Sequence, residues 1–179
     1  DVGMERNNKL LLAGEIANRD LSPGRRFVAK LAHACWKENF QITTDGWRNY
    51  KSLMGNHFSG CDFGMLIKIC NVAGDTTRYS PGTIIEFKKK AVHGTPDEDR
   101  MCTSHVERGN LTIRMGMRRF TRLTNGFSKS FENHDAALDL HFGLYNFFTT
   151  HGPLWTTPSP APGPAHHPCP AADPIPRPK

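Results

Sequence analysis

The sequence predicts an α/β layered domain that is followed by a proline-rich tail. The patterns at its start follow the order hairpin, helix, strand, helix, which is typical of an α/β domain. A chain of 179 residues is long enough for one domain with a proper core and an appendage. Ten of the 13 prolines lie between Pro153 and Pro178, a density that excludes the interior of a helix or sheet.

The first elements are a hairpin and a helix. Apolar runs at Val2–Met4 and Leu10–Ala13 flank the polar turn Glu5–Asn8 and predict a β-hairpin. Ser22–Pro23 predicts the start of a helix, with the serine as its N-cap and the proline in its first turn. We expect this helix to end near Glu38. Its apolar face is predicted to hold Phe27, Leu31 and Ala34.

A strand and a second helix follow. Phe40–Thr44 alternates and is rich in β-branched residues, so it predicts a strand that Asp45–Gly46 closes. The next helix is expected over Trp47–Phe58. The pattern from Ser59 to Arg100 is weaker, with several turn dipeptides and the basic run Lys88–Lys90. It predicts an irregular insertion with two short strands.

Two helices are expected to complete the domain. The first runs from about Thr103 to Asn125, and the second from about Ser130 to Thr150. Ser130 is a plausible N-cap of the second helix, and acids follow early, where the helix dipole favours them. We assign residues 1–151 to the domain and residues 152–179 to a disordered tail.

Ser104–Ser128 carries the strongest chemical signal, because its one acid, Glu107, leads into a run of cations. Six cations lie within 22 residues: Arg108, Arg114, Arg118, Arg119, Arg122 and Lys129. In a helix, one side would hold Val106, Gly109, Ile113, Gly116, Met117 and Phe120. The opposite side, in an arc of roughly 80°, would hold Glu107, Asn110, Arg114 and Arg118. An acid that binds a metal ion, beside arginines that bind phosphate, suits phosphodiester chemistry. Glu107 equally fits an i,i+4 pairing partner on a solvated face.

Asp45 is the second candidate acid, at the carboxyl end of the predicted strand. Asp-Gly is a common turn dipeptide, yet strand ends in α/β sheets are also where active-site groups gather. If the fold brings Asp45 and Glu107 together, the two carboxylates could share magnesium ions. Asn110 would then support the site. The residues expected to hold the DNA backbone are Arg114 and Arg118, extended by Arg119 and Arg122.

Composition limits the partners and the compartment. The formal net charge of +6 suggests a polyanionic partner. The five cysteines are scattered and never form a CxxC pair, so we expect reduced thiols and a cytoplasmic protein. No apolar run approaches the length of a membrane span, so no membrane partner is expected.

Several blocks resemble the transposases of the insertion sequence one family. The stretch HVERGNLTIRMGMRRFTRLTNGFSKSFENHDAALDLHFGLYNF looks like the carboxyl-terminal catalytic segment of that family. QITTDGWRNY resembles the block with the second catalytic aspartate, and VGMERNNKLLLAGEIANRD resembles the hairpin before the first long helix. The resemblance extends from about Val2 to Pro158.

The resemblance implies a ribonuclease-H-like fold and a DDE site that uses Mg²⁺ or Mn²⁺ to cut and rejoin DNA. By position, Asp45 matches the second acid of the site and Glu107 the third. Family members carry the first aspartate in a strand upstream of the hairpin, so we expect an N-terminally truncated fragment with little activity alone. Asp1 does not match that first acid.

The partners implied by the resemblance are transposon ends and target DNA, with a homo-oligomer as an open option. Two alternatives remain. One is a non-catalytic DNA-binding remnant that uses the arginines alone, and the other is a ribonuclease-H-like nuclease that cuts without joining.

Overall fold

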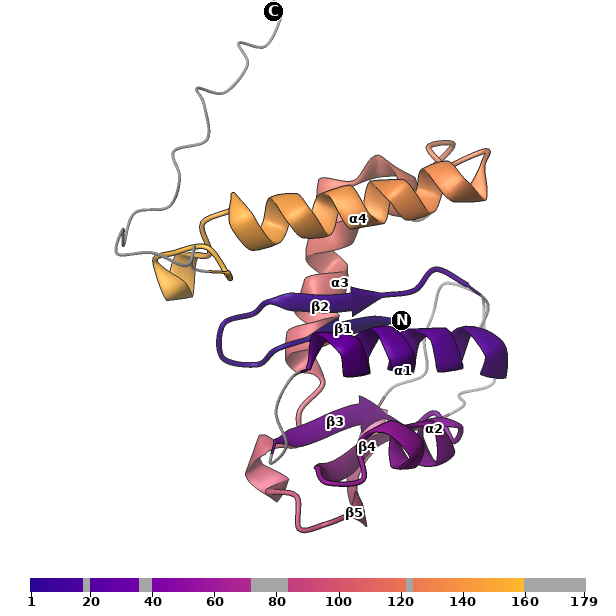
Figure 1. Cartoon of the computed structure of the whole chain (residues 1–179), viewed down its shortest axis with the longest axis vertical. Coiled ribbons are helices and arrows are strands. Elements are labelled where there is room, and N and C mark those ends of the chain that lie inside the picture. The colour runs from indigo at the N-terminus through magenta and orange to yellow at the C-terminus, as the bar shows by residue number, and fades with distance from the viewer. Residues whose placement is uncertain (18–19, 36–39, 72–83, 122–123, 160–179) are drawn as a thin grey trace, which may run out of the picture. The chain divides into compact units, whose positions relative to one another are not determined.

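The chain forms a mixed α/β structure, which confirms the α/β class, while the ribonuclease-H-like arrangement stays a prediction. The structure is a computed structural model, shown in Figure 1, and it describes residues 1–17, 20–35, 40–71, 84–121 and 124–159. The chain divides into two compact units: Asp1–Ile16 joins His105–Lys179 in the first, and Ala17–Ser104 forms the second. We predicted one ribonuclease-H-like domain over residues 1–151. Whether the two units together form that domain stays a prediction.

The first unit begins with the predicted hairpin, which is confirmed. Strand β1 (Val2–Met4) pairs antiparallel with β2 (Leu11–Gly14). The carboxylate of Glu5 holds the turn, because it accepts hydrogen bonds from the backbone N–H of Asn7 at 2.8 Å and of Asn8. Lys9 follows with a φ of 60°, in the left-handed region that tight turns require.

Helix α4 (Phe131–Phe147) packs along β2 in the same unit (Figure 1). Its predicted N-cap is confirmed: the Ser130 hydroxyl accepts a hydrogen bond from the N–H of Asn133 at 3.4 Å. The helix approaches β2 closely, since a Cβ added at Gly14 would lie 3.0 Å from side-chain carbons of α4. Glycine at this position therefore sets the distance between helix and hairpin.

Helix α3 (Ser104–Gly116) is shorter than predicted, so the expectation of one helix to Asn125 is wrong. Met117 is extended, and a separate 3₁₀ turn, η2 (Arg118–Phe120), follows. The hydroxyl of Thr121 donates to the carbonyl of Arg114 at 3.1 Å, which satisfies one of the last carbonyls of α3. The chain thus leaves the α3 axis at Gly116, and Arg118 and Phe120 do not continue its faces.

The segment after α4 packs onto the first unit as far as Ser159. A 3₁₀ turn, η3 (Gly152–Leu154), is followed by a single bridge between His151 and Thr156. Thr157 is only 4% exposed, and the N–H of Ser159 donates to the carbonyl of Asn146 at 2.9 Å. The first eight residues of the predicted tail are therefore part of the packed structure, and residues 160–179 lie outside the described stretches.

The second unit opens with α1 (Leu21–Ala34), which packs against α2 (Tyr50–His57). The prediction of Ser22 as N-cap is wrong: Asp20 is the N-cap, and Ser22 and Pro23 lie within the first turn. Phe27 and Leu31 are buried as predicted. Ala34 is exposed instead, and the buried face continues through Val28. The predicted helix end, Glu38, lies outside the described residues.

A three-stranded sheet forms the rest of this unit. Strand β3 (Gln41–Asp45) pairs parallel with β4 (Asp62–Cys70), and β5 (Ile84–His93) pairs antiparallel with β4. The insertion was predicted to hold two short strands; its described residues hold two strands, but these are longer, with nine residues in β4 and ten in β5. A 3₁₀ turn, η1 (Glu98–Arg100), leads from this sheet towards α3. None of the described helices is both long and apolar enough to cross a membrane.

Candidate functional site

Asp45 is the last residue of β3, at the carboxyl end of the parallel β3–β4 pair. It lies opposite Leu66 in the register, and its side chain is half-buried. Its Oδ1 accepts a hydrogen bond from the N–H of Trp47 at 3.1 Å. This is the side-chain contact of an Asp-Gly turn, so the turn role that the sequence allowed is present. The carboxylate nevertheless stands where α/β sheets gather ligand-binding groups.

An open hollow of about 620 Å³ adjoins Asp45. The residues that line it come from the end of β3, the segment after it and the middle of β4: Asp45, Gly46, Trp47, Arg48, Asn49, Leu66, Ile67 and Lys68. The lining therefore combines one carboxylate with two cations, Arg48 and Lys68. Such a mixture suits an anionic ligand held beside a carboxylate, as phosphate chemistry requires.

Parallel pairing brings the two halves of this hollow together. Because β4 continues for four residues beyond the end of β3, Lys68 extends past Asp45 along the neighbouring strand. The turn lies against β4 at this point: a Cβ added at Gly46 would lie 3.4 Å from the side chain of Ile67, an ordinary van der Waals contact. The hollow therefore lies beside the part of β4 that continues beyond the end of β3.

Glu107 lies in the first turn of α3, in the other unit, and its side chain is exposed. Asn110 and Arg114 follow one and two turns later, and both are half-buried. These three residues share one helix face, as the sequence predicted. Arg118 does not share that face, because it lies on η2 beyond the end of α3.

The remaining predicted arginines have different surroundings. Arg119 donates from Nη1 to the carbonyl of Asn133 at 2.8 Å, which ties η2 to the first turn of α4. Arg118 is exposed and passes close to Gly126, where an added Cβ would lie 2.7 Å from its Cγ. Arg122 lies outside the described residues. Arg119 therefore has a structural contact beside any role towards DNA.

The two candidate acids fall in different units, Asp45 in the second and Glu107 in the first. Within the described stretches, no group of three or more His, Cys, Asp or Glu side chains is placed to hold a metal ion. The predicted site uses two carboxylates, one from each unit. That shared magnesium or manganese site stays a prediction.

Two features of these units were not expected from the sequence. His105 lies beside the hairpin turn, with its Nδ1 3.2 Å from Nζ of Lys9. Since an ammonium group only donates, Nδ1 accepts, and burial together with Lys9 and Arg6 lowers the pKa of His105 below 6.5. The second feature is Lys68, whose place in the hollow depends on strand pairing and has no signal in local sequence.

No protein-family model, no curated protein and no solved structure matches this chain.

Proposed function

We propose that this chain is part of the catalytic domain of a DDE transposase of the insertion sequence one family, with a ribonuclease-H-like fold. Its chemistry would be metal-dependent DNA cleavage and strand transfer. The observation that carries the proposal is the position of Asp45 at the carboxyl end of a parallel strand, over a hollow with Arg48 and Lys68. The order of Glu107, Asn110 and Arg114 along one helix face supports it.

In this proposal each residue type has a distinct task. The carboxylates of Asp45 and Glu107 are hard oxygen donors of the kind that Mg²⁺ and Mn²⁺ prefer, and they would hold the metal. The bound metal would supply an activated water or 3′-hydroxyl and stabilise the leaving oxygen. Asn110 would orient Glu107 by hydrogen bonding, and Arg114 and Arg118 would hold the DNA backbone.

The shared metal site can be tested by Mn²⁺ titration of the full chain, followed by water-proton relaxation. We expect Asp45→Asn and Glu107→Gln each to weaken Mn²⁺ binding at least about tenfold, the cost typical of disturbing a metal site. If both acids hold one ion, either substitution weakens the binding of that same ion; if they hold separate ions, each single variant keeps the other ion at wild-type affinity. The matched controls Asp99→Asn and Asp139→Asn, one exposed acid from each unit, should leave binding unchanged.

Two Mn²⁺ ions in the wild type, with one of them kept at wild-type affinity in each single variant, would show that the acids bind separate ions, and the shared site would have to be abandoned. Strand transfer on supercoiled DNA then tests the reaction itself. Products that are cut but never joined would favour the ribonuclease-H-like nuclease over the transposase.

The second candidate is a DNA-binding remnant without catalysis, which the run of cations after Glu107 favours. It predicts salt-sensitive binding to DNA of any sequence. Binding would survive Asp45→Asn and Glu107→Gln but decline with Arg114→Ala and Arg118→Ala. This DNA-binding result, together with Mn²⁺ binding that neither acid substitution changes, would favour the non-catalytic DNA-binding remnant over the transposase.

A further inference from the structure

Strands β4 and β5 extend beyond the rest of their sheet as a two-stranded ribbon. The last β3 residue, Asp45, pairs with Leu66, so from Ile67 onward β4 is paired only with β5. Opposite Ile67–Cys70, β5 runs from Ile84 to Lys88, and Lys89 and Lys90 lie at the base of this extension, opposite Leu66 and Met65. We call Ile67–Cys70 together with Ile84–Lys90 the lysine ribbon. The base of β4 is anchored in the core, where Phe63 is 2% exposed, whereas every described β5 residue of the ribbon is exposed.

The lysine ribbon carries positive charge on both of its faces. Its four lysines are Lys68, Lys88, Lys89 and Lys90, and its one acid is Glu86. The register places Lys68 opposite Phe87 and Leu66 opposite Lys89, so one face presents Lys68 and Lys89. The alternate residues Lys88 and Lys90 project from the other face, about 7 Å apart along the strand.

Edge protection accounts for only part of this composition. Lysines on an edge strand do discourage pairing with other chains. However, the lysine ribbon also exposes large apolar groups, with Ile85 65% and Phe87 54% exposed. Nζ of Lys68 lies 6.0 Å from the centroid of the Phe87 ring, a cation–π distance. Cations on both faces with exposed apolar groups between them are typical of a surface that binds a polyanion.

We propose that the lysine ribbon binds double-stranded DNA, with its lysines on the phosphate backbones and its strands along the major groove. The major groove of B-form DNA admits a two-stranded β-ribbon, and phosphates of both strands flank it. A ribbon that enters the groove edge-on turns one face towards each backbone, so lysines on both faces can contact both backbones. The major groove of double-stranded RNA is too deep and narrow for this contact, which is why duplex DNA is the partner that fits.

The lysine ribbon also leads directly to the candidate acid. Lys68 belongs both to the ribbon and to the lining of the hollow that contains Asp45. Duplex DNA along the ribbon would therefore pass the mouth of that hollow, within the second unit alone. This binding goes beyond the proposed function and does not require catalysis.

The test is fluorescence anisotropy of a labelled duplex with the full chain, between about 50 and 200 mM salt. The variant K88Q/K89Q/K90Q removes three charges and keeps polar, unbranched side chains that are one atom shorter. Each lost phosphate contact lowers the slope of log affinity against log salt by about 0.9, so three lost contacts lower it by about 2.7. We expect weaker binding at every salt concentration, with the flatter salt dependence.

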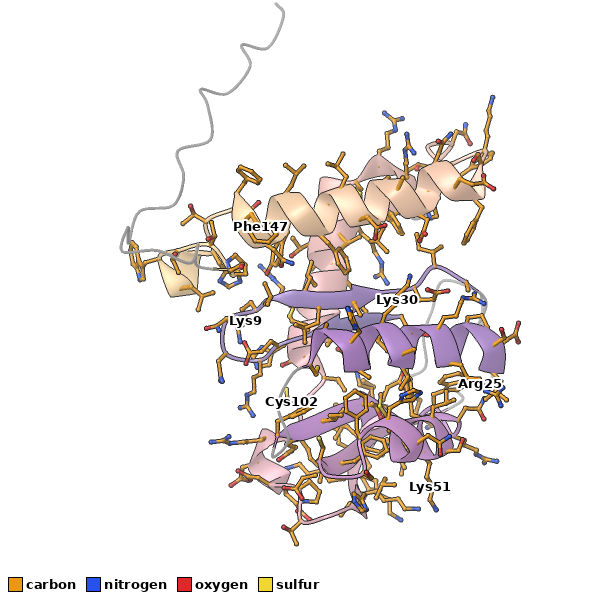
Figure 2. The ribbon with its side chains drawn as sticks, in the orientation of Figure 1. Lys9, Arg25, Lys30, Lys51, Cys102 and Phe147 are labelled. Atoms are coloured by element: carbon orange, nitrogen blue, oxygen red, sulfur yellow. The ribbon has the colours of Figure 1, made fainter. Side chains whose placement is uncertain are left out.

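The matched control is R25Q/K30Q/K51Q, which removes three exposed cations of the same unit from α1 and α2 (Figure 2). Both variants lower the formal net charge from +6 to +3. The control should keep the wild-type slope. Equal losses in the two variants would show a net-charge effect, and an unchanged slope in the ribbon variant would show no contact; either result overturns the proposal.

Two further measurements keep the test decisive. Far-ultraviolet circular dichroism reports whether the triple variant folds, and if it does not, Lys88→Gln alone should lower the slope by about 0.9. Tighter binding to an RNA duplex or to anionic lipid vesicles than to DNA would overturn the choice of partner. The variant D45N/E107Q should keep full duplex binding, so failure of the catalytic proposal is distinguishable from failure of this one.

Discussion

Asn146 is the clearest point at which to test how the first unit is held together. Asn146 is 8% exposed, and its side-chain amide forms hydrogen bonds with the backbone of Leu11, which lies 135 residues earlier in the chain. Its Oδ1 accepts from the N–H of Leu11, and its Nδ2 donates to the carbonyl of the same residue, both at 2.9 Å. Both polar groups of one β2 residue are therefore satisfied by one amide on α4.

Asn146→Ala would leave both backbone groups of Leu11 buried without this partner. The side chain of Leu11 is 4% exposed, so water reaches them poorly. Each buried group left unpaired costs about 1–3 kcal/mol, and the two together should therefore lower the free energy of unfolding by about 2–6 kcal/mol. That is a large part of the 5–15 kcal/mol typical of a whole domain.

Urea unfolding followed by circular dichroism measures this loss, and amide hydrogen exchange at Leu11 locates it. Asn133→Ala is the matched control, because it makes the same substitution on an exposed residue of α4 and should cost less than about 0.5 kcal/mol. The reasoning is refuted if the two variants lose the same stability, or if exchange at Leu11 is as slow in Asn146→Ala as in wild type.

Three further outcomes follow from the packing and charge of single residues. Gly64→Ala should destabilise by about 1–3 kcal/mol, because a Cβ there would lie 2.6 Å from Cε of the buried Met101; wild-type stability would contradict this. Gly55→Ala should stabilise by about 0.5–1 kcal/mol in the same urea assay, since this α2 position has open space for a Cβ. Burial lowers the pKa of His141 below 6.5, so the unfolded state binds more protons and stability should fall as the pH drops below 6.5. His141→Phe should remove part of that loss in thermal unfolding measured across pH, and an identical pH profile would count against it.

Local signals were sufficient for elements whose determinants lie within a few residues. The hairpin follows from a turn that Glu5 closes through Asn7 and Asn8, and the start of α4 follows from the Ser130 cap. Strand β3 follows from its β-branched alternation, and Asp45 was correctly placed at its carboxyl end. Short-range hydrogen bonds and pattern are readable in sequence because both partners are neighbours in the chain.

Local signals failed where the structure depends on contacts or exposure that the local sequence pattern does not show. The length of β5 was missed because an exposed ribbon has no buried face to impose alternation on its sequence. The end of α3 was missed because the Thr121 hydroxyl, seven residues beyond Arg114, takes up its carbonyl.

Composition and local pattern were enough to indicate a basic α/β chain with one acid at a strand end and another in the first turn of a helix, ahead of a run of arginines. Two further features depend on the tertiary structure. Lys68 of β4 lines the same hollow as Asp45, and Asn146 forms hydrogen bonds with Leu11, 135 positions away. The physical reason is that strand register and helix docking are set by burial and backbone pairing between distant segments. Neither segment's own sequence contains a periodic pattern that identifies its partner.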